Sequence, residues 1–220
     1  AAYHSDVGNL APSLAAKFVH EHEAGEASLE AAYDLGGARM LGRGMAGCVR
    51  TCVKRGTHDT FALKSLQIDM LDPASLAELR TEVAILKSLD HPHIVRLFET
   101  FIQPRDGQIH IVMELLAGEH LKARLRREGK GFAEPQASGW FRQMVASVLY
   151  CHTHGVCHRD IKLENFVLEK KSDASAVKLI DFGLAANVKH GEEQMSDSVG
   201  TLPFMAPEVL AAQINRRSIR

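Results

Sequence analysis

Apolar residues in the first half of the chain fall into short runs of the length and type that form β-strands. Turns rich in Gly or Asp separate these runs, which cover residues 38–41, 48–53, 60–66, 95–101 and 109–115. Between the third and fourth runs, apolar residues recur at the three- and four-residue spacing of a helix; they are Leu76, Leu79, Val83, Leu86 and Leu89. The pattern predicts a small antiparallel sheet with one helix at 73–89.

After Gly118 the apolar spacing becomes helical. Residues 121–128 and 134–154 are predicted helices, and the second is expected to pack through one face. That face would consist of Trp140, Met144, Val145, Val148 and Leu149. A last apolar run at 176–180 is predicted to be a strand that ends at a polar loop.

These elements predict an α+β fold of two lobes. A small sheet lobe covers residues 33–116, and a mainly helical lobe covers residues 117–220. Residues 1–32 are rich in Ala and Glu and carry apolar residues at helical spacing, namely Leu14, Phe18 and Val19. We interpret them as an N-terminal extension that either packs on the main domain or is loosely tethered to it.

Composition narrows the classes of function. Of 220 residues, 45% are hydrophobic and 24% are charged, as in ordinary globular proteins. The net charge is −1, so nothing global indicates nucleic acid or an anionic membrane as a partner. No apolar run approaches the roughly 18–20 residues of a membrane span. Four cysteines are too few for a disulfide framework, which predicts a reducing compartment: the cytoplasm, with the nucleus as the alternative.

One cluster of soft ligands resembles a zinc site only superficially. It runs Cys151-His152-x-His154-x-x-Cys157-His158. No C-x-x-C pair and no second half-site accompany it, so we interpret it as a helix end followed by a turn.

The strongest chemical signal begins at His158, the last residue of this cluster. The run His158-Arg159-Asp160-Ile161-Lys162-Leu163-Glu164-Asn165 places a carboxylate, an ammonium and a carboxamide on one short loop. Sixteen residues after the Asn, the predicted strand at 176–180 ends at Asp181-Phe182-Gly183. Phosphoryl transfer to a hydroxyl needs such a set: an acceptor for the proton, a cation for developing charge and oxygen ligands for Mg²⁺.

The pattern H-R-D-x-x-x-x-N followed by D-F-G resembles the protein-kinase family. The resemblance implies that Asp160 accepts or orients the substrate hydroxyl proton and that Lys162 steadies the γ-phosphate. It also implies that Asn165 and Asp181 ligate Mg²⁺. A Lys at position 162 is what serine/threonine kinases show, so ATP, Mg²⁺ and proteins with Ser or Thr acceptors are the expected cofactors and substrates.

A glycine-rich run fits G-x-G-x-x-G-x-V and consists of Leu41, Gly42, Arg43, Gly44, Met45, Ala46, Gly47, Cys48 and Val49. It links two predicted strands, whereas the dinucleotide fingerprint opens a helix, so a dinucleotide-binding module is the weaker interpretation. The resemblance implies that this hairpin closes over the phosphates of ATP and that Val49 covers the adenine.

Two further segments complete the predicted ATP site. Ala62 and Lys64 lie in Phe61-Ala62-Leu63-Lys64, which resembles V-A-I-K, and the Lys is the expected ligand of the α/β-phosphates. Its expected partner is Glu82, with Glu78 one turn earlier as the competing choice. At the end of the small lobe the resemblance implies an adenine-binding connector, formed by Met113, Glu114 and Leu116.

Two positions bear on the choice of substrate. Many relatives carry Gly-Gly-Glu where this chain has Gly118-Glu119-His120, so a carboxylate that helps to hold ribose or a basic substrate residue is displaced or missing. Glu164 is expected to favour a basic residue on the N-terminal side of the target.

The segment after Gly183 resembles a kinase activation segment that ends at Ala206-Pro207-Glu208. Ser196 and Ser198 are its candidate phosphorylation sites, with Arg159 as a cation for the phosphate. Thr201 is expected to orient the catalytic loop instead.

Within the family, several stretches look like calcium-dependent protein kinases, although no calcium-binding loop motif occurs in the chain. The chain ends twelve residues after Glu208. We therefore expect a kinase cut short within its large lobe, with a calcium-sensor module as an expected partner beyond it. The alternative function is a pseudokinase or a non-catalytic nucleotide-binding scaffold.

Overall fold

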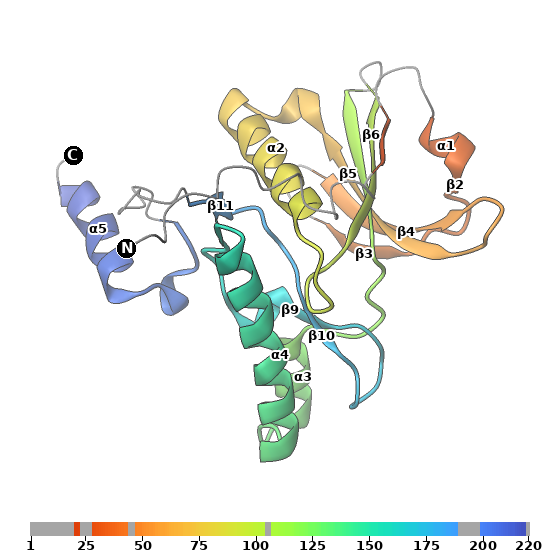
Figure 1. The fold of residues 1–220 in the computed structure, drawn as a ribbon. Helices are drawn as coiled ribbons and strands as arrows, with labels where there is room; N and C mark the ends of the chain where they lie inside the picture. The colour runs from red at the N-terminus through yellow and green to blue at the C-terminus, as the bar shows by residue number, and fades with distance from the viewer. Residues whose placement is uncertain (1–19, 23–27, 44–46, 104–106, 189–198, 219–220) are drawn as a thin grey trace, which may run out of the picture.

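The structure is a computed structural model that describes residues 20–22, 28–43, 47–103, 107–188 and 199–218. One half is a twisted seven-stranded sheet in the order β1-β6-β7-β5-β4-β2, with β3 also paired to β4 (Figure 1). Its strands are β1 (His20–His22), β2 (Tyr33–Asp34), β3 (Met40–Arg43), β4 (Gly47–Lys54), β5 (Thr60–Gln67), β6 (Leu97–Gln103) and β7 (Gln108–Met113). The described pairings are antiparallel except that β1 runs parallel to β6.

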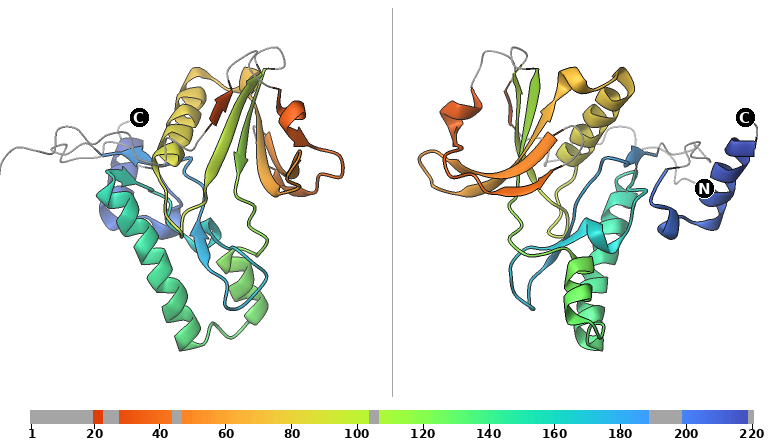
Figure 2. Two further views of the ribbon diagram at one scale, coloured as in Figure 1. Left: turned by 45° about the vertical axis from the view of Figure 1, so that its right-hand side comes forward. Right: turned by 180° about the vertical axis from the view of Figure 1, so that it is seen from behind.

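The other half is mainly helical, which confirms the predicted two-lobed α+β fold. Its helices are α3 (Leu121–Glu128), α4 (Glu134–Thr153) and α5 (Pro207–Ser218). Short ladders join β9 (Phe166–Leu168) to β10 (Val177–Leu179) and β8 (Val156–Cys157) to β11 (Ala186–Asn187). Figure 1 and the right-hand view of Figure 2 show α5 set apart from α3 and α4. Every described helix is too short or too polar to cross a bilayer.

Helix α2 (Pro73–Ser88) lies against the sheet (Figure 1) and carries one carboxylate on its buried face. The Asp72 side chain accepts a hydrogen bond from Ser75 N at 2.7 Å, and Pro73 opens the first turn, so the sequence fixes where the helix begins. Its buried residues are Leu79, Glu82, Val83, Ile85 and Leu86. Because Glu82 shares the buried face, packing of the helix also sets the direction of this carboxylate.

The described residues before position 33 pack on the sheet. Ser28 caps the short helix α1 (Leu29–Ala32), and Leu29 is fully buried in a cluster with Tyr33, Cys52, Leu63, Phe101 and Val112. The Tyr33 hydroxyl donates to Glu99 Oε1 at 3.0 Å, and Lys54 Nζ lies 2.8 Å from the same oxygen. Burial raises the pKa of Tyr33, and the negative charge of Glu99 raises it further. The phenol therefore stays protonated and holds β2, which directly follows α1, to β6.

The packed face of α4 differs from the prediction. Trp140 is buried and its Nε1 donates to Ser175 O at 3.1 Å, and Met144 packs on the core. Val145 and Leu149, which the sequence placed on the same face, are 48% and 60% exposed. At about 100° per residue, Leu149 lies about 180° around the helix from Trp140, so both cannot face the core.

Backbone hydrogen bonds join the two halves at β10. Leu179 N donates to His93 O at 2.9 Å, and Val95 N donates to Leu179 O at 3.0 Å. Ile180 N then donates to Asn165 O at 2.9 Å. The end of β10 is thereby fixed between the sheet half and the loop that carries Asn165, directly before Asp181.

The burial of Leu29 generates a prediction about the N-terminal segment. Leu29→Ala should lower the free energy of unfolding by about 3 kcal/mol, because it removes a fully buried side chain and leaves a cavity. Met70→Ala is the matched control, since Met70 is 79% exposed and should change stability by less than about 0.5 kcal/mol. Chemical denaturation of both variants measures the difference; equal effects would show that α1 is not part of the core.

Candidate active site

A cavity of about 520 Å³ lies where the two halves meet. Of the predicted ATP-binding residues, those that line it are Leu41, Gly42, Val49, Ala62, Lys64, Met113, Glu114 and Leu116. The cavity lining does not include Arg43, Gly47 or Cys48. For Cys48 the reason is strand alternation, which turns its side chain away from the face of Val49. The remaining predicted residues, Gly44, Met45 and Ala46, lie outside the described residues.

Gly47 instead permits close strand pairing. A Cβ at this position would come within 2.0 Å of the Ser65 carbonyl oxygen, so a side chain would push β4 away from β5. At Gly42, by contrast, no such neighbour lies within 4 Å of the position that a Cβ would take. The hairpin is therefore tightly paired to β5 at Gly47, and it leaves open space beside Gly42, which lines the cavity.

The cavity combines apolar walls with free backbone groups of the connector at residues 114–116. Apolar side chains of Leu41, Val49, Ala62, Val95, Leu116, Val167 and Ile180 contribute to its lining. Among the described residues, the Glu114 carbonyl and the Leu116 amide have no hydrogen-bond partner, whereas Glu114 N donates to Arg96 O at 2.9 Å. A flat heteroaromatic ring with one donor and one acceptor fits such a wall.

Lys64 and Glu82 meet across the cavity. Lys64 Nζ lies 2.6 Å from Glu82 Oε1, which joins β5 to α2. Glu78, the competing choice, is exposed and forms no ion pair with any described residue. The Glu82 side chain is only 9% exposed, so it requires this cation.

Five carboxylates line the cavity, and four of them have a cation of the chain as partner. The pairs are Glu82 with Lys64, Glu114 with Lys178, Glu119 with Arg127 and Glu164 with Lys122. Asp181 is the exception among the described residues: its Oδ1 accepts only from Gly183 N, at 3.4 Å. The cavity therefore contains one carboxylate whose charge no side chain balances.

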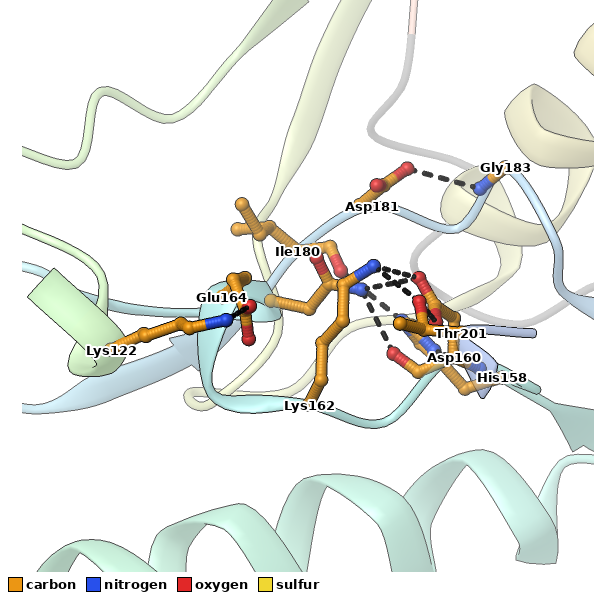
Figure 3. A network of polar contacts seen from close by, with 10 residues as sticks. Lys122, His158, Asp160, Lys162, Glu164, Ile180, Asp181, Gly183 and Thr201 are labelled. Atoms are coloured by element: carbon orange, nitrogen blue, oxygen red, sulfur yellow. Dashed lines mark hydrogen bonds and ion pairs between the residues drawn. The ribbon is translucent and has the colours of Figure 1, made fainter. Parts of the chain in front are cut away.

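Asp160 is held by three side chains (Figure 3). Its Oδ2 accepts from Lys162 Nζ at 2.6 Å and from Asn165 Nδ2 at 3.1 Å, and its Oδ1 accepts from Thr201 Oγ1 at 2.6 Å. Burial by itself raises the pKa of Asp160, but the hydrogen bonds from Lys162 and Thr201 outweigh it, so the pKa lies below its ordinary value. Asp160 is thus an oriented carboxylate that is ionised at neutral pH.

Asn165 is oriented by the same loop. Its Nδ2 also donates to Asp160 O at 2.8 Å, and the side chain is buried. Because the amide nitrogen is engaged twice, the Oδ1 atom remains for another ligand.

His158 joins this loop to the segment before Asp181. Its Nε2 lies 3.1 Å from Ile180 O, and Asp160 N donates to its Nδ1 at 3.3 Å. Burial lowers the pKa of His158, so the ring is neutral, as these two bonds require. The ring also packs on fully buried Phe182 at 4.8 Å between centroids.

This engagement bears on the soft-ligand cluster noted in the sequence. His154 Nδ1 lies 2.9 Å from Tyr150 O at the end of α4, and Cys151 is buried. These side chains belong to a helix end and the turn after it.

Two non-glycine residues beside the site have a left-handed backbone. Arg159 has φ 64° and Asp181 has φ 63°. Such a conformation costs free energy and persists only where the surroundings hold it. Arg159 is held by a hydrogen bond from Nε to Leu184 O at 2.6 Å.

Thr201 is the one predicted activation-segment residue that the structure describes, since Ser196 and Ser198 lie outside the described residues. Its Oγ1 also accepts from Lys162 Nζ at 2.8 Å. Thr201 and Asp160 line a second cavity, of about 330 Å³. The hydroxyl is therefore engaged in the Asp160 network.

Sequence reasoning missed part of the rim. Glu119, His120 and Glu164 line the first cavity, and Lys122 contacts Glu164. The sequence connected Glu119 and His120 with a displaced or missing ligand of ribose or of a basic substrate residue, and Glu164 with substrate choice. It carried no signal for Lys122.

Comparison with known proteins agrees with this geometry. A sequence profile described as the protein kinase domain matches residues 37–219. The chain is 41% identical over 184 residues to calcium-dependent protein kinase 20 of Oryza sativa subsp. japonica, which covers 83% of this chain and 32% of that protein. It is 41% identical over 180 residues to calcium-dependent protein kinase 7 of Arabidopsis thaliana, 81% of this chain and 32% of that protein.

A third relative, serine/threonine-protein kinase kin-29 of Caenorhabditis elegans, is 36% identical over 178 residues, 81% of this chain and 21% of that protein. The chain spans about a third of the length of the calcium-dependent relatives. With the family profile covering most of its length, the chain belongs to the protein kinase family.

Proposed function

We propose that this chain provides an ATP-dependent protein serine/threonine kinase activity, which transfers the γ-phosphoryl group of ATP to a protein hydroxyl. The observation that carries the proposal is Asp181: among the described residues it is the one carboxylate of the cavity without a cationic side-chain partner, while the other four are paired. A second, ionised carboxylate, Asp160, is on the loop that is hydrogen-bonded to Ile180, the residue before Asp181 (Figure 3).

The nucleotide is proposed to bind with its adenine against the Glu114–Leu116 connector. The free carbonyl of Glu114 and amide of Leu116 support this orientation, as do the apolar walls. Lys64 then reaches the α/β-phosphates while Glu82 keeps its ammonium in place. Family membership implies ATP as the phosphoryl donor.

Mg²⁺ fits the donors that remain. Asp181 offers an unpaired carboxylate and Asn165 offers Oδ1, and oxygen atoms are the ligands that this ion prefers. We propose these two residues as its protein ligands; when bound there, the ion would supply positive charge to the phosphate oxygens. Asp181 also has a left-handed backbone, a conformation that costs free energy and that often occurs at functional sites, which supports its role as a ligand.

Asp160 is proposed to orient the incoming hydroxyl and to take its proton. Lys162 bonds to Asp160 here, and we propose that it turns to the γ-phosphate when nucleotide is bound. Thr201 holds Asp160 from the other side. The pseudokinase alternative is not favoured, because the residues that the chemistry needs are present. These are Lys64, Asp160, Asn165 and Asp181.

The acceptor and the regulation of the whole protein are also part of the proposal. Lys162 and the printed names of the relatives support Ser and Thr as acceptors. Two relatives are named calcium-dependent, which supports control by a calcium-sensor module. The cytoplasm, with the nucleus as the alternative, stays a prediction.

Asp160→Asn tests the proposed chemistry. The variant should lower kcat for a serine peptide by on the order of 100-fold or more, because a general base contributes about 10²–10⁴-fold. The Kd for Mg·ATP should change less than about threefold, since Asp160 contacts the hydroxyl and not the nucleotide. Asp59→Asn, at an exposed turn, is the control. Transfer by Asp160→Asn at the wild-type rate would contradict the assignment.

Lys64→Met tests two roles of Lys64 separately: the proposed contact with the phosphates and the ion pair that stabilises the fold. It leaves the buried Glu82 carboxylate without a cation, so the free energy of unfolding should fall by about 3 kcal/mol, and transfer should be lost. Lys64→Met combined with Glu82→Gln should recover most of the stability but none of the transfer. Thermal melts and peptide phosphorylation are measured on the same samples; recovery of transfer in the double variant would rule out a phosphate contact by Lys64.

A further inference from the structure

An ion pair lies at the rim of the cavity, beside the residues assigned to chemistry. Lys122, on α3, contacts Glu164 Oε1, on the turn that also carries Asn165. Figure 3 shows this pair on the opposite side of Lys162 from Thr201. The Glu164 carboxylate is therefore already paired with a cation of its own chain.

Glu164 lies within reach of a peptide whose hydroxyl is at Asp160. The two residues are four positions apart, so at most about 14 Å separates their Cα atoms. An extended peptide advances about 3.3 Å per residue. A long side chain two to four residues from the acceptor can therefore meet the Glu164 carboxylate.

The other groups at this rim offer no free carboxylate either. Glu119 lies 2.7 Å from Arg127 Nη2. His120 Nδ1 accepts from Ala123 N at 3.0 Å, so its remaining ring proton is on Nε2, a donor. Among the described residues, the rim where Gly118–His120 meets Glu164 is therefore balanced in charge.

We propose that Lys122 fills the position that a basic substrate residue would take, so that this chain selects protein substrates with an uncharged residue at that position. The inference rests on the proposed function and names its substrate class. A substrate Arg would have to displace an ammonium that the fold keeps beside Glu164, at high effective concentration. An acidic residue gains nothing either, since the pair is neutral. Lys122 and Glu164 are partly exposed, at 35% and 29%, so the pair is accessible to a peptide.

The test uses the full chain and serine peptides that carry Arg, Ala or Glu in turn at each position within four residues of the acceptor. Wild type should show kcat/KM for the Arg peptide within about threefold of the Ala peptide at every position. Lys122→Ala should raise the Arg-to-Ala ratio about fivefold at one position, the range for a partly exposed ion pair. Lys122→Gln should raise the ratio in the same way, so the test still decides if one of the two variants fails to fold.

Two controls make the result specific. Lys122→Ala combined with Glu164→Gln should return the ratio to the wild-type value. Lys130→Ala, at an exposed position beyond α3, should leave it unchanged. A wild-type preference for Arg above about tenfold, or unchanged ratios in both Lys122 variants, would overturn the proposal.

Affinity measured with fluorescent versions of the same peptides separates the two proposals. Peptide binding without phosphoryl transfer counts against the proposed function alone, and the Arg-to-Ala ratio of Kd then decides about Lys122 by the same criteria. Failure of every variant to bind any peptide overturns the inference about Lys122.

Discussion

Neutralisation of carboxylates along the cleft is the constraint on which this structure depends. A carboxylate taken out of water needs a cation or several hydrogen bonds, and here each cation comes from another element. The pairs connect β5 to α2, the connector to β10, and α3 to the catalytic loop. The same contacts that hold these elements together therefore determine which charges remain for a ligand, and Asp181 is the one that remains among the described residues.

Position is as important as charge at Asp160. Its loop is joined to the segment before Asp181 through the hydrogen bonds of His158 and Asn165 with Ile180, and β10 is joined to the sheet half through His93 and Val95. A shift of β10 would move the Asp160 loop and Asp181 together. Because a misplacement of about 1 Å can cost on the order of 100-fold in rate, the proposed transfer would depend on these hydrogen bonds.

Motif spacing predicted the two-lobed fold and the residues that meet in the cleft, because phosphoryl transfer needs fixed residue types at fixed offsets along the chain. It paired Lys64 with Glu82 for the same reason. The prediction for the packed face of α4 was wrong. It assumed that every apolar residue faces the core and did not consider the angular position of Leu149 around the helix. Sequence reasoning named Glu164 but did not find its partner Lys122, which lies 42 positions away and, as a single charged residue, looks like an ordinary solvated side chain.

The central claim is that Asp181 is unpaired because a cation that arrives with the nucleotide balances it. The most direct measurement is the thermal shift produced by ATP with and without Mg²⁺, in wild type and in Asp181→Asn. The account predicts a clear Mg²⁺-dependent rise in Tm for wild type, because a ligand that binds only the folded state stabilises it. It predicts that most of this rise is lost in Asp181→Asn. Equal shifts with and without Mg²⁺, or an Asp181→Asn variant that keeps the full Mg²⁺-dependent rise, would contradict it.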